Sequence, residues 1–357
     1  LSSAFAGLAG GIFAAMSDFI SPDSFPFFQS ILFLLVVMIG GADRVLGPLL
    51  GALVVVLLPE VLSALAEYRL LFVGLLLLLV LRLAPDGIVG LLARLVHRKG
   101  EPAPAATQEA QALPPVAPVG ALQVENAGIS FGGVRAASGI SFTAEPRRIT
   151  SIIGPNGAGK STLLNLVCGY YTSDSGSIRL GDREISSLPA HRVARAGIAR
   201  TYQTTQLFSQ MTVLDNILIA LHRGSLGATT LFTADRNPQS EAQARSLLAF
   251  VGYTGAIERT AGELAHVDKR LVEIARALAT RPSVLALDEP AAGLDQRDTE
   301  MLGVLLRKVA DLGTLVILVE HDMKLVMSVS DHVVVLDAGQ KIAEGVPRDV
   351  AKDPVVL

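Results

Sequence analysis

One stretch decides the fold of this 357-residue chain: Gly154-Pro155-Asn156-Gly157-Ala158-Gly159-Lys160-Ser161. It has the spacing of a phosphate-binding loop and lies between the apolar run Ile149 to Ile153 and a helical stretch. The glycines let successive backbone N–H groups face phosphates, and the helix adds its positive dipole end. We expect Lys160 to reach the β and γ oxygens and the Ser161 hydroxyl to meet Mg²⁺. The stretch predicts a nucleoside triphosphate site in an α/β domain.

Two apolar runs downstream end in charged residues. The run Val284 to Leu287 indicates a buried strand, and Asp288 and Glu289 follow it. After a phosphate loop, this pattern predicts that Asp288 holds Mg²⁺ through its water shell and that Glu289 polarises the attacking water. The alternative is a strand that ends in surface acids. The run Thr314 to Val319 leads into Glu320-His321-Asp322, which we expect at the sheet edge where open α/β sheets bind ligands.

Composition divides the chain into two parts. Mean hydropathy is +0.49 with 18% charged residues, which is too apolar for an ordinary soluble protein. The excess lies in Leu1 to Leu92, whereas Ala121 to Leu357 alternates apolar and charged stretches like a soluble domain. A net charge of −3 gives no basic stripe and argues against nucleic acid as a partner. The single Cys168 cannot form an internal disulfide, and we expect it to be buried rather than reactive.

Four apolar runs predict membrane spans or half-spans: Ala4 to Met16, Phe28 to Ile39, Leu46 to Leu65 and Leu70 to Leu83. Several are shorter than the roughly 20 residues of an isolated span, so we expect helices that tilt, break at Pro48 or Pro59, or pack in a bundle. Recurrent glycines favour close helix packing over lipid-compatible filler. These glycines are Gly7, Gly10, Gly11, Gly47 and Gly51.

Lysine and arginine set the expected orientation. The connection Ser17 to Pro26 carries acids but no base, whereas Arg94, Arg98 and Lys99 follow the last run. By the positive-inside rule, this connection faces outward and the C-terminal end is cytoplasmic, with Arg69 as the one exception. The chain starts inside an apolar helical pattern without a Met or a signal peptide, so we expect it to be part of a longer polypeptide.

A stretch rich in Ala and Pro, residues 100–120, joins the two parts. It has little charge and no periodicity, which is typical of a semi-rigid spacer that could span on the order of 60 Å. We therefore expect a transmembrane region at residues 1–99, a linker at 100–120 and a nucleotide-binding domain at 121–357.

The order of motifs resembles the ATPase subunit of an ABC transporter. After the phosphate loop come Tyr202-Gln203, Leu264-Ala265-His266-Val267-Asp268, Asp288-Glu289-Pro290, Gly293-Leu294-Asp295 and His321. Residues 197–203 and 211–214 look like the branched-chain amino acid uptake branch, and Glu67-Tyr68-Arg69-Leu70-Leu71 resembles the end of its permease. The resemblance implies an α-helical transmembrane segment joined to an α/β P-loop ATPase domain, which has a small antiparallel β subdomain and a helical subdomain.

The resemblance also implies roles for individual residues. Gln203 would sense the γ-phosphate and Mg²⁺ and relay this to the permease, His321 would contact the γ-phosphate, and Asp295 would lie in the loop joining two ATPase protomers. Phe131 would stack on adenine, although it could equally be a core strand residue. The implied ligands are ATP and Mg²⁺. The expected catalytic residues are Glu289, His321 and Gln203, and the expected Mg²⁺ ligands are Ser161, Gln203 and Asp288. The expected ATP-binding residues are Phe131, Gly154, Pro155, Asn156, Gly157, Ala158, Gly159, Lys160, Ser161, Thr162 and Asp288.

The signature loop departs from the family pattern. The family usually has Gly where this chain has Val267, and Gln where it has Asp268. Val267 removes backbone freedom through its branched Cβ, and Asp268 adds a negative charge where a phosphate should sit. Asp268 could instead cap a helix beginning at Lys269. We hypothesise a weakened signature; the alternative is that the loop still closes, with Lys269 and Arg270 as positive partners.

These expectations describe the ATP-hydrolysing, energy-coupling component of an importer for branched-chain or related hydrophobic amino acids. It would be a multi-pass protein of the cell inner membrane, in contact with membrane lipid, with its ATPase domain in the cytoplasm. The implied partners are a second permease subunit, a periplasmic substrate-binding protein and a second ATPase subunit. A weakened signature favours a heterodimer, because a homodimer would have two poor sites. The alternatives are an importer for urea or short amides, a non-transport ABC ATPase, and a non-catalytic binding or assembly module.

Overall fold

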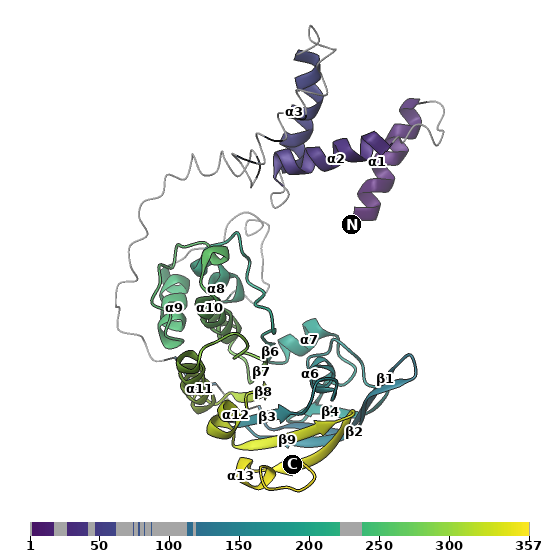
Figure 1. Ribbon diagram of the computed structural model, residues 1–357. Helices are drawn as coiled ribbons and strands as arrows, with labels where there is room; N and C mark the ends of the chain where they lie inside the picture. Colours follow the sequence, from purple (N-terminus) through teal and green to yellow (C-terminus); the bar gives the residue numbers. More distant parts are fainter. Residues whose placement is uncertain are drawn as a thin grey trace. The chain divides into compact units, whose positions relative to one another are not determined.

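The computed structural model describes residues 2–17, 27–41, 47–61, 74, 78, 82, 87, 113–116, 119–221 and 238–356. The chain divides into two compact units, Leu1–Glu101 and Pro102–Leu357 (Figure 1). The predicted membrane orientation rests largely on the connection after Ser17, on Arg69 and on the basic residues 94–99, and all of these lie outside the described residues. Most of the fourth apolar run also lies outside them.

The described part of the N-terminal unit contains α1 (Ser2–Ser17), α2 (Phe27–Gly40) and α3 (Gly47–Val61). These helices coincide with the first three apolar runs. Pro48 lies in the first turn of α3, where its missing N–H is not needed, and α3 continues past Pro59 to Val61, so neither proline ends this helix. Among the described residues, no helix is both long enough and apolar enough to cross a membrane.

Glycines bring α2 and α3 into close contact. A Cβ on Gly40 would lie 1.7 Å from the carbonyl oxygen of Gly47, and a Cβ on Gly51 would lie 1.9 Å from that of Val36. The predicted close packing is confirmed for Gly47 and Gly51, because no larger residue fits at either position. On α1, by contrast, a Cβ would have no neighbour within 4 Å among the described residues at any of its glycines: Gly7, Gly10 and Gly11.

The second unit contains two sheets within residues 119–221 and 238–356 (Figure 1). An antiparallel sheet has the order β2-β1-β4-β5, and a larger sheet has the order β10-β9-β3-β8-β7-β6. In the larger sheet all strands run parallel except β10. The strands are β1 Leu122–Phe131, β2 Val134–Ala144, β3 Ile149–Ile153, β4 Ser175–Leu180, β5 Arg183–Glu184, β6 Ile198–Arg200, β7 Val284–Asp288, β8 Leu315–Val319, β9 His332–Asp337 and β10 Gln340–Gly345.

The three predicted strands are confirmed at the centre of the larger sheet. Every residue of β3, β7 and β8 is buried, because parallel strands are covered on both faces. Alternate residues of a strand point to opposite faces, so Leu285 and Leu287 belong to one core cluster while Val284 and Ala286 belong to another. Continuous apolar runs are therefore what this sheet requires.

Three helices of the second unit pack together as a group. α8, α9 and α10 contact one another and gather at one end of the unit, with β1 and β2 at the other (Figure 1). The helices α8, α9 and α10 form the helical subdomain that the resemblance implies. The β2-β1-β4-β5 sheet forms the antiparallel subdomain that it implies. The helices are α6 Lys160–Val167, α7 Ala190–Arg195, α8 Val213–Leu221, α9 Pro238–Phe250, α10 His266–Ala279, α11 Gln296–Asp311, α12 Met323–Val329, α13 Pro347–Val350 and the 3₁₀ turn Ala261–Glu263.

Part of the expected linker lies against the second unit. The Val116 N–H donates to the Leu312 carbonyl at 2.8 Å, and Leu113 packs on the core cluster beneath α9 and α10. Gly313 has a φ of 108°, and a Cβ there would lie 2.6 Å from the Val116 oxygen. Residues 113–116 are thus attached to the nucleotide-binding unit instead of forming free spacer.

Candidate functional site

The strand order brings four loops to one edge of the larger sheet. β3 pairs with β8, β8 with β7, and β7 with β6, all in parallel. The carboxyl ends of parallel strands meet at one edge, so the segments that follow them converge there. These segments are the phosphate loop after β3, Gln203 after β6, Glu289 after β7 and His321 after β8.

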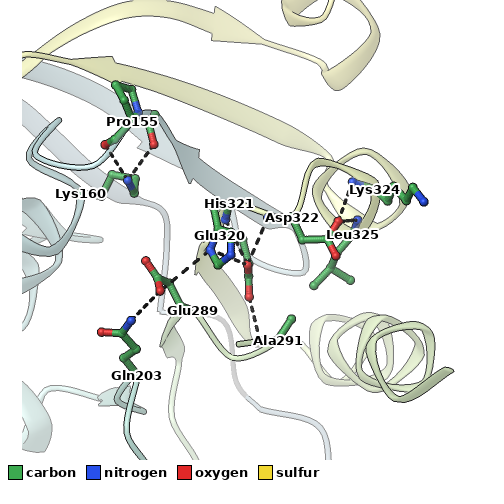
Figure 2. Close-up of polar contacts among 11 residues, drawn as sticks. Pro155, Lys160, Gln203, Glu289, Ala291, Glu320, His321, Asp322, Lys324 and Leu325 are labelled. Atoms are coloured by element: carbon green, nitrogen blue, oxygen red, sulfur yellow. Dashed lines mark hydrogen bonds and ion pairs between the residues drawn. The ribbon is translucent and has the colours of Figure 1, made fainter. Parts of the chain in front are cut away.

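The phosphate loop curls around its own lysine. The Lys160 ammonium donates to the carbonyl oxygens of Gly154 at 2.7 Å and Pro155 at 2.9 Å (Figure 2). A Cβ on Gly154 would lie 2.0 Å from the Leu336 oxygen, and Gly159, with a φ of 97°, ends the loop where α6 begins. Both positions therefore require glycine. The result is an ammonium group and a helix N-terminus beside one another, which suits a phosphate.

The other predicted phosphate-binding residues lie within this loop or in the first turn of α6. Asn156 and Gly157 are exposed, Ala158 is buried, and Ser161 and Thr162 lie in the first turn of α6. They present a hydroxyl-bearing turn beside Lys160.

Phe131 ends β1 as an exposed aromatic residue. Its side chain is 44% exposed, and it meets the Tyr171 ring edge-on at 5.1 Å between ring centres. Phe131 is therefore not a core strand residue. An exposed ring braced by a second aromatic ring offers a face on which a base can stack.

The three predicted catalytic residues lie together. Gln203 Nε2 donates to Glu289 Oε2 at 2.7 Å, and His321 Nδ1 lies 3.9 Å from the same oxygen (Figure 2). Glu289 has a φ of 45°, a left-handed conformation that is strained for a non-glycine residue and typical of functional positions. The Glu289 side chain is 20% exposed. A carboxylate that is oriented by an amide and open to solvent can orient a water molecule and accept its proton.

Glu320 organises the loops behind this group. It is fully buried; its Oε1 accepts the Ala291 N–H at 2.8 Å and its Oε2 accepts the His321 N–H at 3.1 Å (Figure 2). The contacts tie the end of β8 to the loop after β7. The sequence motif Glu320-His321-Asp322 included this residue, but sequence reasoning assigned it no role. An acidic residue directly after a fully apolar strand could have indicated a structural role for it.

Asp288 is held by a residue that sequence reasoning did not single out. Arg200, the last residue of β6, donates to Asp288 Oδ2 at 2.8 Å, and both side chains are almost buried. The other guanidinium nitrogen of Arg200 donates to Asn165 on α6. Among the described residues, no hydrogen bond joins Asp288 to the other two expected Mg²⁺ ligands, Ser161 and Gln203.

The donor set nevertheless fits a magnesium ion. Asp288 Oδ1 accepts no hydrogen bond from the described residues, and Ser161 offers an exposed hydroxyl in the first turn of α6. Hard oxygen donors of this kind, completed by water, are those that Mg²⁺ prefers.

The two members of a buried ion pair within α10, Arg270 and Glu273, hydrogen-bond to the segment after β6. Arg270 donates to the carbonyl oxygens of Tyr202 at 2.7 Å and Gln203 at 2.8 Å, and to Glu273 at 2.9 Å. Glu273 also accepts the Gln206 N–H at 3.1 Å. Burial raises the pKa of Glu273 in spite of the Gln206 and Arg270 contacts. Sequence reasoning missed the contacts of Arg270 with Tyr202 and Gln203, because these partners are backbone atoms far away in the sequence.

α10 begins earlier than predicted. Ala265 is its N-cap, in an extended conformation without a side-chain hydrogen bond, and the helix starts at His266, not at Lys269. Val267 and Asp268 are therefore in the first turn, and Asp268 does not cap the helix. An acid in the first turn is still favoured by the helix dipole, which explains why the helix can include Asp268.

The signature loop contacts the segment that precedes α11. His266 Nε2 lies 3.0 Å from the Ala292 carbonyl oxygen, and Gly293 follows with a φ of 78°. Asp295 caps α11 by accepting the Asp298 N–H at 2.8 Å. The two segments that the resemblance assigns to the protomer interface thus touch within one chain.

Cys168 is buried beside Arg200, as predicted for a small apolar role. Burial raises the pKa of its thiol to about 12, although the positive charge of Arg200 acts in the opposite direction. The thiol is therefore neutral at physiological pH and unsuited to nucleophilic chemistry.

The phosphate loop and the two acidic residues at the end of β7, Asp288 and Glu289, define a P-loop nucleoside triphosphatase. Residues 137–292 match the family described as ABC transporter, and residues 1–81 match the branched-chain amino acid transport system / permease component family. The structure of a nucleotide-free ATP-binding cassette from an ABC transporter is similar, with a TM-score of 0.60 at 32% identity over 66% of this chain and 97% of that chain.

Two relatives indicate which group of ABC transporter proteins this chain resembles. The high-affinity branched-chain amino acid transport ATP-binding protein BraF of Pseudomonas aeruginosa is 42% identical over 243 residues, which cover 66% of this chain and 95% of BraF. LivG of Escherichia coli (strain K12), which carries the same description, is 39% identical with the same coverage. The chain belongs to the ABC transporter family, as a relative of the branched-chain amino acid transport ATP-binding proteins. Its second unit is an ATPase that binds ATP.

Proposed function

We propose that this chain is the energy-coupling ATPase of an importer for branched-chain amino acids, with permease helices attached to it. One observation carries the proposal: the two units separately match proteins of the same transport system, residues 1–81 a permease component and the second unit its ATP-binding proteins. The permease part comprises residues 1–99, the linker 100–120 and the ATPase domain 121–357. The protein resides in the inner membrane, with its ATPase domain in the cytoplasm.

The geometry supports a division of labour among the site residues. The phosphate loop and Lys160 bind the phosphates, and Phe131 stacks on adenine. Glu289 accepts the proton of the attacking water, Gln203 orients Glu289, and His321 contacts the γ-phosphate. A bound Mg²⁺, held by Ser161, Gln203 and Asp288, would supply charge neutralisation at the β- and γ-phosphates.

The signature loop points to an unlike ATPase partner. Val267 stands in the first turn of α10, where a branched side chain limits the approach of a phosphate to the helix N-terminus, and Asp268 opposes the charge of that phosphate. Paired with a second, different ATPase subunit, this chain keeps one competent site, which its own Lys160 and the partner's signature form. A second permease subunit and a periplasmic binding protein complete the importer.

Uptake in cells tests the proposal. Cells that depend on this protein are given the wild type, Glu289→Gln or Glu300→Gln, and the uptake of labelled leucine, isoleucine and valine is compared with that of urea and acetamide. Glu300 is a matched control, because it lies on α11 and the only hydrogen bond of its carboxylate among the described residues is from Gln296. We expect Glu289→Gln to abolish leucine uptake and Glu300→Gln to leave it intact.

Other outcomes separate the alternatives. Uptake of urea or acetamide in place of leucine would assign the short-amide substrate class. Leucine uptake that survives Glu289→Gln would leave a non-catalytic assembly role. Membrane attachment is checked by fractionation: removal of residues 1–99 should move the protein from the membrane pellet to the supernatant.

A further inference from the structure

Arg200 joins three parts of the ATP site. Its guanidinium group contacts Asp288 at the end of β7 at 2.8 Å and Asn165 on α6, the helix whose first turn carries Lys160 and Ser161. A planar guanidinium can hold two oxygen acceptors at once in a fixed geometry, which an ammonium cannot do. Arg200 therefore fixes the carboxylate of Asp288 relative to the helix that carries the predicted Mg²⁺ ligand Ser161.

Two tyrosines hold the guanidinium in place. Its central carbon lies 5.6 Å from the ring centre of Tyr170 and 5.2 Å from that of Tyr202, and the two hydroxyl groups are hydrogen-bonded to each other. Arg200 Nε is buried without a hydrogen-bond partner among the described residues, so the side chain is held by its two terminal nitrogens and by the rings. Such a confined side chain has little freedom to release Asp288.

We propose that Arg200 is a positioning residue for ATP hydrolysis: it occupies Asp288 Oδ2 and so orients Oδ1 toward the Mg²⁺ that accompanies ATP. The inference rests on the proposed Mg²⁺-dependent binding of ATP. Residues that orient a metal-binding side chain typically affect metal affinity by roughly 10- to 100-fold. If the salt bridge only stabilised the fold, removing Arg200 would leave the effect of Mg²⁺ on ATP affinity unchanged. If Arg200 only repelled Mg²⁺, removing it would increase that effect.

The experiment measures ATP affinity with and without Mg²⁺. The dissociation constant of ATP is determined by calorimetry in EDTA and in Mg²⁺, for the full chain carrying Glu289→Gln to prevent turnover. The ratio of the two constants is the Mg²⁺ gain. We expect Arg200→Met to lower the Mg²⁺ gain by roughly 10-fold or more, while the affinity in EDTA stays within a factor of about 3. Arg200→Lys should retain part of the gain, because it keeps the charge but loses the fork.

A matched control and a double variant isolate the contact. Arg276 lies 5.5 Å from the Phe208 ring centre and donates to the Gln206 carbonyl oxygen, so Arg276→Met makes the same chemical change without touching Asp288. It should leave the Mg²⁺ gain unchanged. In an Asp288→Asn background, Arg200→Met should cause no further loss, because the carboxylate it orients is gone.

Each remaining outcome decides against the inference. An unchanged Mg²⁺ gain in Arg200→Met would make the pair purely structural, and an increased gain would make Arg200 a repelling charge. A loss that persists in the Asp288→Asn background would show that Arg200 does not act through Asp288. Absence of any Mg²⁺ gain in the unmutated Arg200 protein would defeat the proposed Mg²⁺ site as well. If Arg200→Met fails to bind ATP in EDTA, Arg200→Lys decides, since a gain equal to that of Arg200 overturns the inference.

Discussion

The phosphate edge of the large sheet and the first turn of α10 are built in contrasting ways. At the phosphate edge, Lys160, Asp288 and Glu289 each have a hydrogen-bonded or charged partner, and glycines occupy the loop positions that no other residue can fill. At the start of α10, Ala265 provides no side-chain cap, and Val267 occupies the position where the family has glycine. The residues expected to bind the chain's own nucleotide are held by hydrogen bonds, whereas the surface expected to face a partner's nucleotide departs from the pattern that the resemblance implies.

Under the proposed pairing with an unlike ATPase, the two halves of an ABC-type site would be free to differ in this way. A phosphate loop serves the chain that contains it, so the residues around it remain mutually dependent. In the proposed pair, the signature loop would face the nucleotide of the other chain, so a change in it would affect the site that holds the partner's nucleotide. The following predictions test this difference, from the largest expected effect to the smallest.

Arg270→Met tests the connection between the two regions and should have the largest effect. It leaves Glu273 buried without its charged partner and removes two hydrogen bonds to the segment after β6. We expect a loss of about 3–5 kcal/mol in the free energy of unfolding, measured by urea denaturation. The double variant Arg270→Met/Glu273→Leu should recover much of it. A single-variant loss below about 1 kcal/mol would contradict the contact.

Lys160→Met tests the phosphate edge alone. Removing a charged hydrogen-bond donor costs about 1.5–3 kcal/mol, so ATP affinity should fall roughly 10- to 150-fold in a calorimetric titration. Lys324→Met, at the exposed start of α12, is the matched control and should bind ATP normally. Equal affinity in Lys160→Met and wild type would mean that the loop does not hold phosphate.

Val267→Gly tests the altered surface of α10. In the purified chain at high concentration, where two copies provide both surfaces, ATP turnover should rise about 3- to 10-fold, or roughly 1 kcal/mol of barrier. Val267→Ala serves as control, because it keeps a Cβ and should give little increase. Equal ATP turnover in Val267→Gly and wild type would contradict the hypothesis that the signature loop is weakened.

Glu344→Gln changes a residue of β10, outside both regions, and should have the smallest effect on stability. Burial alone would raise the pKa of Glu344, but the hydrogen bonds from Lys341 and His332 outweigh burial and lower it. A lowered carboxyl pKa gives stability above the ordinary pKa of Glu, and this stability is lost as the pH falls through the lowered value. Glu344→Gln should therefore lower the free energy of unfolding at pH 7 by less than about 1 kcal/mol, with the difference vanishing in acid. A difference that grows in acid would contradict the sign.

Sequence patterns predicted the parts of this structure that depend on local chemistry. β3, β7 and β8 were predictable because each is a short continuous apolar run followed by a loop motif. The pairing of Arg200 with Asp288 was not, because it depends on β6 lying beside β7, and nothing in the intervening sequence records that register.

The start of α10 and the glycine spacings show the same limit. The capping preference of Asp268 suggested a helix from Lys269, but the extended conformation of Ala265 starts it at His266. Gly47 and Gly51 meet a neighbouring helix while the similarly spaced Gly7 and Gly10 meet none among the described residues. Spacing indicates which face can pack closely, and only the partner helix decides whether it does.

The hydrogen bond between Val116 and Leu312 has a mechanical consequence. Because residues 113–116 are attached there, the chain leading from the N-terminal unit first meets the second unit ahead of β1. A pull along this part of the chain would act first at Leu312, the end of α11, and not at β1. The next strand in the chain is β8, which leads to His321, so tension on the linker would enter the molecule one strand away from the residue proposed to contact the γ-phosphate.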